Sequence, residues 1–106
     1  MTAQPDERIG ELRLVIDGLD RRIVALLAER TRVVRELTEF KDDEQAVRSP
    51  DRVALVVAKV RALAEENGAP PEIVEATYRA LIEALTELQL ARLAERRTAA
   101  AVPGRS

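Results

Sequence analysis

Large apolar side chains between residues 9 and 40 recur at alternating spacings of three and four residues. Nine of these ten positions are apolar and one is an arginine: Ile9, Leu12, Ile16, Leu19, Ile23, Leu26, Arg30, Val33, Leu37 and Phe40. A heptad seam of this kind lies along one face of a long α-helix, which packs against a second helix. We therefore predict a first helix over about residues 6–42.

Two further helices are predicted from the residues that begin and end them. The dipeptide Ser-Pro at 49–50 indicates a helix start with Ser49 as the N-cap, and Asn-Gly at 67–68 indicates the end. Pro-Pro at 70–71 begins a third helix that runs to about residue 97, and the stretch DDEQAVRSPDR before the second helix is interpreted as a loop. Mostly apolar faces follow in both: Val53, Val56, Val57, Val60, Leu63 and Ala64, then Val74, Thr77, Tyr78, Leu81, Leu85, Leu88 and Leu93.

The composition favours helices over a sheet. Hydrophobic residues make up 46% of the chain but aromatic residues only 2%, and Ala, Leu, Val, Glu and Arg dominate. We predict an all-α fold with three helices per chain, in which one domain spans residues 8–97 and flexible segments span residues 1–7 and 98–106.

The length of the first helix predicts an assembly. A helix of ~36 residues is ~54 Å long, whereas a compact globule of 106 residues has a radius of gyration of about 13 Å. One chain is too small to cover such a rod. We therefore expect a homodimer, a helical bundle in which two first helices pack together and the other helices cover their flanks.

Several residue types are missing, and their absence excludes whole classes of chemistry. The chain has no cysteine and no histidine, so we expect no disulfide, no thiol nucleophile, no zinc site and no histidine acid–base catalysis. The net charge of −2 gives no overall field for nucleic acid or an anionic membrane. Without an apolar run of ~20 residues or a signal peptide, the chain is predicted to be cytoplasmic, with no metal and no cofactor.

Five polar residues interrupt or flank the apolar faces. Arg30 lies in the seam, and Lys41 follows eleven residues later on nearly the same face, ~16 Å away. Arg13 precedes Arg30 by ~25 Å, so only the Arg13 of an antiparallel partner helix would come close to Arg30. Arg52 lies in the first turn of the second helix, where the helix dipole favours an anion, and Gln89 flanks the stripe of the third helix. Together they predict a pocket for a small polyanion.

Each candidate also has a structural interpretation. A seam arginine can reach solvent or pair with a nearby carboxylate such as Glu29. Lys41 can be a solvated surface lysine, Gln89 can face solvent, and Arg52 can close an ion pair one turn away. No single residue distinguishes these interpretations, whereas the combination favours the anion pocket.

The segments ELRLVIDGLDRRIVALLAER, FK, RSPDRV and TYRALIEALTELQ resemble the all-helical type II chorismate mutase family, which includes 4-amino-4-deoxychorismate mutases and isochorismate pyruvate lyases. The resemblance covers about residues 8–96. It implies an intertwined helical homodimer with active sites shared between the chains, and a small dicarboxylate as the substrate.

The resemblance also implies roles for individual residues. Arg30 and the Arg13 of the other subunit would bind the two carboxylates of the substrate, and Arg52 would line the pocket near them. Lys41 and Gln89 would face the ether oxygen of the enolpyruvyl group. A [3,3] rearrangement needs no nucleophile, metal or cofactor, only a folded substrate and positive charge where the C–O bond breaks.

Three positions depart from the common pattern of that family and concern the substrate. Ser49 and Val53 stand where many members carry acidic residues associated with the ring hydroxyl at C4, and Leu85 stands where a small polar residue is common. These departures leave open a mutase acting on chorismate or, slightly preferred, on 4-amino-4-deoxychorismate in secondary metabolism such as antibiotic biosynthesis. An isochorismate pyruvate lyase and a non-catalytic helical dimerisation module are the alternatives.

Overall fold

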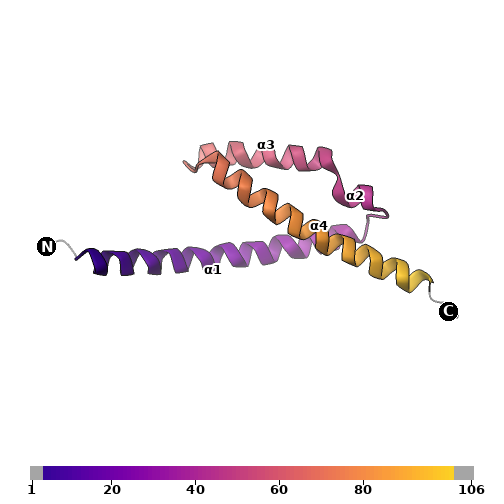
Figure 1. Ribbon diagram of the computed structural model, residues 1–106, viewed down its shortest axis with the longest axis horizontal. Coiled ribbons are helices and arrows are strands. Elements are labelled where there is room, and N and C mark those ends of the chain that lie inside the picture. Colours follow the sequence, from indigo (N-terminus) through magenta and orange to yellow (C-terminus); the bar gives the residue numbers. More distant parts are fainter. Residues whose placement is uncertain (1–3, 102–106) are drawn as a thin grey trace. The chain divides into compact units, whose positions relative to one another are not determined.

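The computed structural model describes residues 4–101, and in this range all regular structure is helical. Four helices follow one another (Figure 1): α1 (Pro5–Thr38), α2 (Glu44–Arg48), α3 (Pro50–Glu66) and α4 (Pro71–Ala101). The all-α prediction with three long helices is confirmed, while the short α2 is additional. Parts of the predicted flexible ends, residues 1–3 and 102–106, lie outside the described residues. The chain divides into two units between Val33 and Val34, and each unit is described by itself.

Helix α1 leaves its predicted apolar seam open to solvent. Its single buried residue is Thr38, near the C-terminal end. The seam residues Leu12 and Leu19 are 44% and 45% exposed, and Ile16 and Ile23 are exposed by about half. A row of exposed large side chains at heptad spacing is the surface that a helix buries against a partner.

The first helix ends four residues earlier than predicted. After Thr38 the backbone tightens into turns, in which Phe40 N–H donates to the Leu37 carbonyl at 3.1 Å and Lys41 N–H to the Thr38 carbonyl at 3.0 Å. The prediction of an end near residue 42 is therefore wrong. The seam spacing continues to Phe40, but this side chain is 80% exposed and supplies no burial that would keep the helix going.

The segment predicted as a loop contains helix α2. Asp43 is its N-cap, and the Asp43 carboxylate accepts a hydrogen bond from the Ala46 backbone N–H at 2.8 Å. Val47 is only 4% exposed and anchors the short helix. The acidic run after Lys41 therefore begins a helix, a signal that the sequence carries in Asp43.

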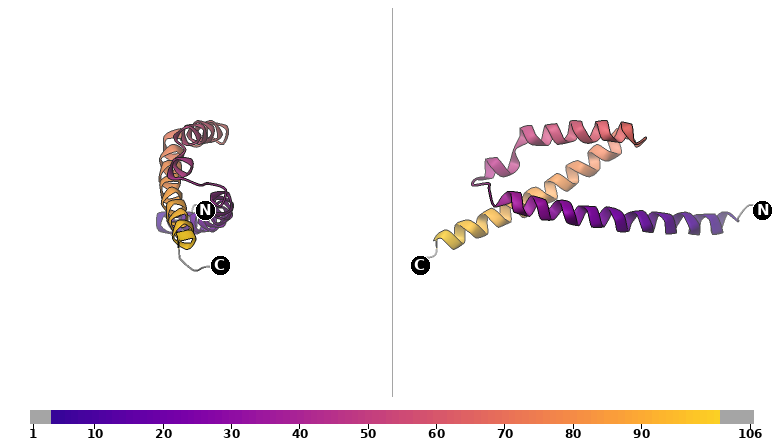
Figure 2. Two further views of the ribbon diagram at one scale, coloured as in Figure 1. Left: turned by 90° about the vertical axis from the view of Figure 1, so that its right-hand side faces the viewer. Right: turned by 180° about the vertical axis from the view of Figure 1, so that it is seen from behind.

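Helices α3 and α4 form a hairpin in the second unit (Figure 2). Gly68, at φ 72°, ends α3 as predicted: the Ala69 N–H donates to the Ala64 carbonyl at 2.8 Å and the Gly68 N–H to the Glu65 carbonyl at 3.2 Å, a Schellman motif. The core consists of small aliphatic side chains and two leucines, namely Val47, Val57, Val60, Ala64, Leu85 and Leu93.

Ser49 differs from its predicted role. It does precede α3 and Pro50, but it adopts the left-handed conformation at φ 32° and its side chain makes no capping hydrogen bond. Its backbone N–H instead donates to the Gln45 carbonyl at 2.9 Å and closes α2. Ser49 thus ends α2 and begins α3. In the left-handed conformation that this turn requires, its side chain does not cap α3.

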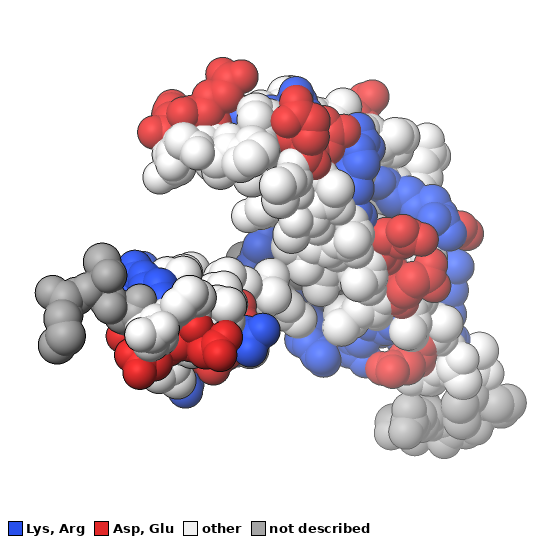
Figure 3. All heavy atoms as spheres, turned by 60° about the vertical axis from the view of Figure 1, so that its left-hand side comes forward, with Lys and Arg blue, Asp and Glu red and all other residues white. Residues whose placement is uncertain are grey.

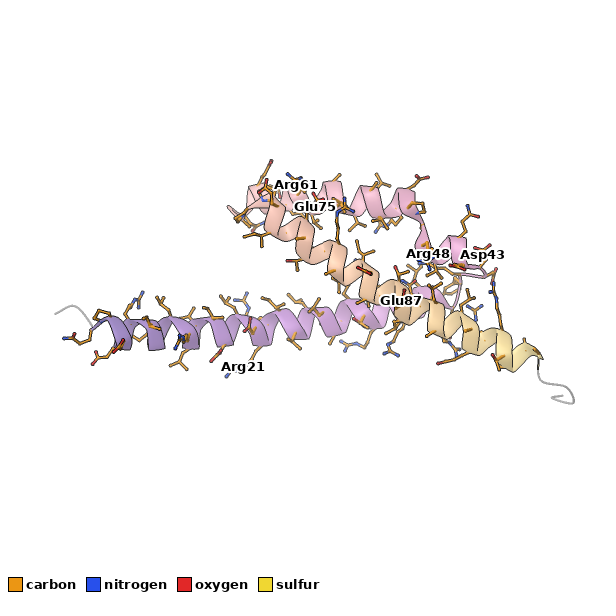
Figure 4. All side chains as sticks on the ribbon, in the orientation of Figure 1. Arg21, Asp43, Arg48, Arg61, Glu75 and Glu87 are labelled. Atoms are coloured by element: carbon orange, nitrogen blue, oxygen red, sulfur yellow. The ribbon has the colours of Figure 1, made fainter. Side chains whose placement is uncertain are left out.

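The surface of the hairpin carries both acidic and basic side chains, so neither sign of charge dominates it. At its closed end, Arg61 of α3 donates to the Glu75 carboxylate of α4 at 2.8 Å (Figure 4). Basic and acidic side chains are interspersed on the face shown in Figure 3. Within the part of the chain that the structure describes, no helix is both long enough and apolar enough to cross a lipid bilayer.

Candidate active site

Two predicted site residues from opposite ends of the second unit's sequence meet directly. The Lys41 Nζ donates to the Gln89 Oε1 at 2.9 Å. Lys41 follows the C-terminus of α1 and Gln89 lies in the middle of α4, where it is only 6% exposed. The structural interpretations of a solvent-facing Gln89 and a merely solvated Lys41 are therefore wrong.

A third side chain, which the sequence did not single out, completes this contact. Thr38 is fully buried, and its Oγ1 lies 3.1 Å from the Gln89 Oε1 and 2.6 Å from the Val34 carbonyl oxygen. Because a lysine ammonium only donates, the atom facing Lys41 is the oxygen of the carboxamide. The Gln89 amide nitrogen, a donor, is the other terminal atom of the group and takes no part in this contact.

An arginine two turns further along α4 holds the turn that carries Lys41. The Arg96 Nη1 donates to the carbonyl of Thr38 at 3.1 Å and to that of Lys41 at 2.8 Å. Beside it, Arg92 donates from Nε and Nη2 to Glu39, at 3.0 and 2.6 Å to Oε1. Arg92 lowers the pKa of the Glu39 carboxyl through this hydrogen bond. Both arginines attach the residues after α1 to α4, and so they fix the backbone at Lys41.

The electrostatics of Lys41 favour an anion. Burial lowers the pKa of its ammonium first, and the positive charge of Arg52 lowers it further. No acidic side chain of the described residues contributes in the opposite sense. Two positive charges that repel each other gain free energy when an anion binds near both of them.

The other predicted residues of the second unit surround this pair. Arg52 is exposed in the first turn of α3 and makes no ion pair with an acidic side chain among the described residues, so its predicted structural alternative is wrong. Leu85 is buried one turn before Gln89 on α4, at 7% exposure. Ser49 and Val53 are half-buried at the start of α3.

Arg13 and Arg30 belong to the first unit. Both lie on α1, where Arg13 is exposed and Arg30 is half-buried. Along the helix they are ~25 Å apart, too far for one small ligand to touch both on one chain. The predicted convergence of these arginines with Lys41 and Gln89 therefore stays a prediction.

A surface depression of about 530 Å³ borders the site at Thr38. Its lining mixes both charges with apolar groups and consists of Arg35, Thr38, Glu39, Leu88, Ala91, Arg92 and Glu95. None of the predicted site residues lines it, so it is a neighbour of the candidate site. In the described range no three acidic side chains converge in an arrangement that could hold a metal ion.

Sequence reasoning missed Thr38 and Arg96. A threonine inside a helix is usually a surface residue, and nothing in the local pattern marks Thr38 as buried. Arg96 carried a usable signal, since it follows Gln89 by seven residues and therefore lies on the same face of α4.

Comparison with known proteins places this arrangement in a family. The model of the family "Chorismate mutase type II" matches residues 12–90. The chain is 34% identical to an isochorismate pyruvate lyase of Pseudomonas aeruginosa over 74 residues. These residues cover 70% of this chain and 73% of that protein. Over 84 residues it is 29% identical to a chorismate mutase of Methanocaldococcus jannaschii, 78% of this chain and 85% of that protein. The all-helical protein whose Lys41 and Gln89 meet in this way belongs to the chorismate mutase type II family of enzymes.

Proposed function

We propose that the protein is an isomerase that catalyses a [3,3] rearrangement of chorismate or a close analogue to the prephenate-type product. The observation that carries the proposal is the contact of Lys41 with Gln89, in which the Lys41 ammonium donates to the carboxamide oxygen while no acidic side chain of the described residues raises the pKa of Lys41. Membership of the chorismate mutase family supports the same reaction.

The chemistry asks little of the protein beyond position and charge. In the rearrangement the C–O bond of the enolpyruvyl ether breaks while a C–C bond forms within the same molecule, so nothing is gained or lost. The ether oxygen becomes more negative as its bond lengthens. The Lys41 ammonium and the Gln89 amide N–H would donate to this oxygen and stabilise it more in the transition state than in the ground state.

Binding of the two carboxylates belongs to the arginines. We place Arg30 at one carboxylate, the Arg13 of a second chain at the other, and Arg52 beside them, because guanidinium groups hold carboxylates in a bidentate manner. The exposed apolar seam of α1 supports a homodimer, in which the Arg13 of one chain reaches the site of the other. The predicted cytoplasmic location is part of this proposal.

Val53 and Leu85 bear on the choice of substrate. Val53, which stands where the resemblance places a contact with a substituent at C4 of the ring, is apolar and half-buried, and the apolar Leu85 is buried. Glu83 and Glu87, the carboxylates nearest to Leu85 in sequence, are exposed. An ammonium at C4 would favour a nearby carboxylate, so the preference for 4-amino-4-deoxychorismate rests on the sequence resemblance alone and the direct substrate comparison decides it.

The second candidate function is isochorismate pyruvate lyase, which forms salicylate and pyruvate from isochorismate. Its support is the relative from Pseudomonas aeruginosa that carries this name, together with Val53, which the resemblance also associates with the lyases. The same cations serve this reaction, because it breaks the same kind of ether bond.

The test is to incubate the purified protein separately with chorismate, 4-amino-4-deoxychorismate and isochorismate and to identify the products by chromatography. Prephenate or its 4-amino counterpart establishes the mutase and names its substrate, and salicylate with pyruvate establishes the lyase. If none of the three is converted, the proposal fails in favour of a non-catalytic dimerisation module.

The chain offers a matched control for the role of Lys41. Lys41→Met should lower kcat by at least ~100-fold with a smaller change in KM, because it removes charge that acts mainly in the transition state. Lys59 is the only other lysine and is exposed on α3, so Lys59→Met should leave both constants unchanged. A loss confined to KM for Lys41→Met would assign the ammonium to substrate binding instead.

A further inference from the structure

We propose that Thr38 is a positioning residue that fixes the orientation of the Gln89 carboxamide for the reaction proposed above, on which this inference rests. Thr38 has no exposed surface, and its hydroxyl is the second group, after Lys41, within hydrogen-bonding distance of the Gln89 Oε1. It makes no contact with substrate in this role. It acts through Gln89.

The distances define what the hydroxyl does. Lys41 requires the amide oxygen on its side, so in a hydrogen bond between Thr38 and the same oxygen, at 3.1 Å, the hydroxyl is the donor. A hydroxyl has one proton, so Thr38 serves either Gln89 or the Val34 carbonyl at 2.6 Å at any moment. The helix already supplies the Val34 carbonyl with the Thr38 backbone N–H. The Gln89 oxygen, by contrast, is served by side chains alone, namely the Lys41 ammonium and this hydroxyl.

When the Thr38 hydroxyl donates to Gln89, two donors act on one amide oxygen, and this has two consequences for catalysis. They hold the carboxamide against rotation by 180°, which would aim its oxygen at an ether oxygen that needs a donor. They also draw electron density from the amide nitrogen, so that its N–H becomes a better donor. Because Gln89 itself is buried, orientation of this kind makes the donor ready before the substrate reacts.

The main competing role for Thr38 is purely structural, and the chain contains a matched control for it. Thr77 on α4 is exposed and donates from its Oγ1 to the Ile73 carbonyl at 2.8 Å, the same bond to the fourth residue before it that Thr38 makes to Val34. Thr77→Val therefore removes a helical back-bond alone. Thr38→Val removes a back-bond and the donor to Gln89 while keeping the side-chain shape, and Thr38→Ser keeps the hydroxyl but loses the methyl group.

The first readout is the side-chain amide signals in a ¹⁵N–¹H NMR spectrum. The chain has three glutamines and one asparagine, so only four pairs of signals occur, and Gln89→Glu identifies the pair of Gln89 by its loss. In Thr38→Val we expect the Gln89 pair to shift and to broaden from rotation, and in Thr38→Ser and Thr77→Val to stay in place. An unchanged Gln89 pair in Thr38→Val would overturn the proposal.

The second readout is turnover of whichever substrate the wild-type protein converts. Thr38→Val should lower kcat by about 5- to 30-fold with KM within about 3-fold of wild type, the scale of one lost hydrogen bond. Thr38→Ser should restore kcat to within about 3-fold, and an equal loss in both variants would make Thr38 structural. If Thr38→Val fails to fold, Thr38→Ala replaces it in the same comparison with Thr38→Ser.

The two proposals fail in different ways. If the wild-type protein converts none of the three substrates, the proposed function fails. The amide signals of Gln89, which need no turnover, then decide by themselves whether Thr38 holds this carboxamide.

Discussion

At the scale of single residues, the site combines the cations Lys41 and Arg52 with the carboxamide of Gln89, and no acidic side chain of the described residues offsets the charge of Lys41. Lys41 is lowered in pKa first by burial and second by Arg52, and Gln89 is oriented by its contact with the Lys41 ammonium. Placing a half-buried ammonium near a second positive charge costs free energy, and a bound anion lowers that cost. The cost is the usual mark of a functional site.

The lowered pKa of Lys41 predicts a specific pH dependence. The ammonium is the active form, so kcat/KM, which reports the free enzyme, should fall as the pH rises through this lowered pKa. A bound dicarboxylate restores the pKa towards its ordinary value, so kcat should fall only at higher pH. Rate profiles for both constants measure this difference, and coincident alkaline limbs would exclude Lys41 as the titrating group.

The lowered pKa of Lys41 also makes the stability of the fold depend on pH. The unfolded chain holds the Lys41 proton to higher pH than the folded one, so this residue makes the free energy of unfolding rise with pH between the lowered and the ordinary pKa of lysine.

At the scale of elements, the site depends on how helices end. Because α1 ends at Thr38, Lys41 lies in the turn that follows the helix. Arg96 of α4 donates to the carbonyls of Thr38 and Lys41. At the other end of α2, Ser49 ends that helix and begins α3, so that Arg52 lies in the first turn of α3. The functional groups thus lie at helix ends, where backbone groups and side chains outside the helical ladder are available.

The conformation of Ser49 predicts the effect of its replacement on stability. Because its side chain makes no capping bond, Ser49→Ala should change the free energy of unfolding by less than ~0.5 kcal/mol, instead of the ~1 kcal/mol that a lost serine cap costs. Ser49→Gly should stabilise the protein by up to ~1 kcal/mol, because glycine adopts a positive φ without strain. Denaturant unfolding measures both, and a loss of ~1 kcal/mol in Ser49→Ala would restore the capping role.

At the scale of the whole molecule, α1 presents apolar side chains that the chain does not bury. The seam residues from Ile9 to Ile23 are exposed by 44% to 53%, although they recur at the heptad spacing that is typical of a packed helix–helix interface. Their burial between two chains would supply the core that the first unit lacks.

The proposed dimer predicts opposite results for two substitutions on α1. Leu19→Glu places a charge in the seam and should weaken dimerisation by more than ~100-fold, since each chain loses the burial of a leucine, ~2 kcal/mol, and gains the cost of a buried charge. Arg21→Glu is the control, because Arg21 follows Leu19 by two residues and therefore lies about 200° around the helix from it. Sedimentation of both variants over a range of concentrations provides the measurement. A Leu19→Glu protein that stays as associated as the wild type would contradict the dimer through this seam.

The sequence by itself determined what repeats or what is local. Seam spacing, proline and glycine signals and composition were enough for three long helices, the end of α3 at Gly68 and the all-α class, because helix formation depends on neighbours three and four residues away. The absence of cysteine and histidine limited the chemistry in the same local manner. The residues Lys41 and Gln89 were found through a family resemblance, not through periodicity.

Only the tertiary structure decided which distant groups meet. The contact between Lys41 and Gln89 spans 48 residues, and the contacts of Arg96 with the turn after α1 span 55 and 58. Thr38 became part of the site because α4 buries it, which no local pattern signals. Burial, the lowered pKa of Lys41 and the orientation of Gln89 all arise from this packing of α4 against the end of α1, because desolvation and hydrogen bonding depend on every group nearby and not on sequence neighbours alone.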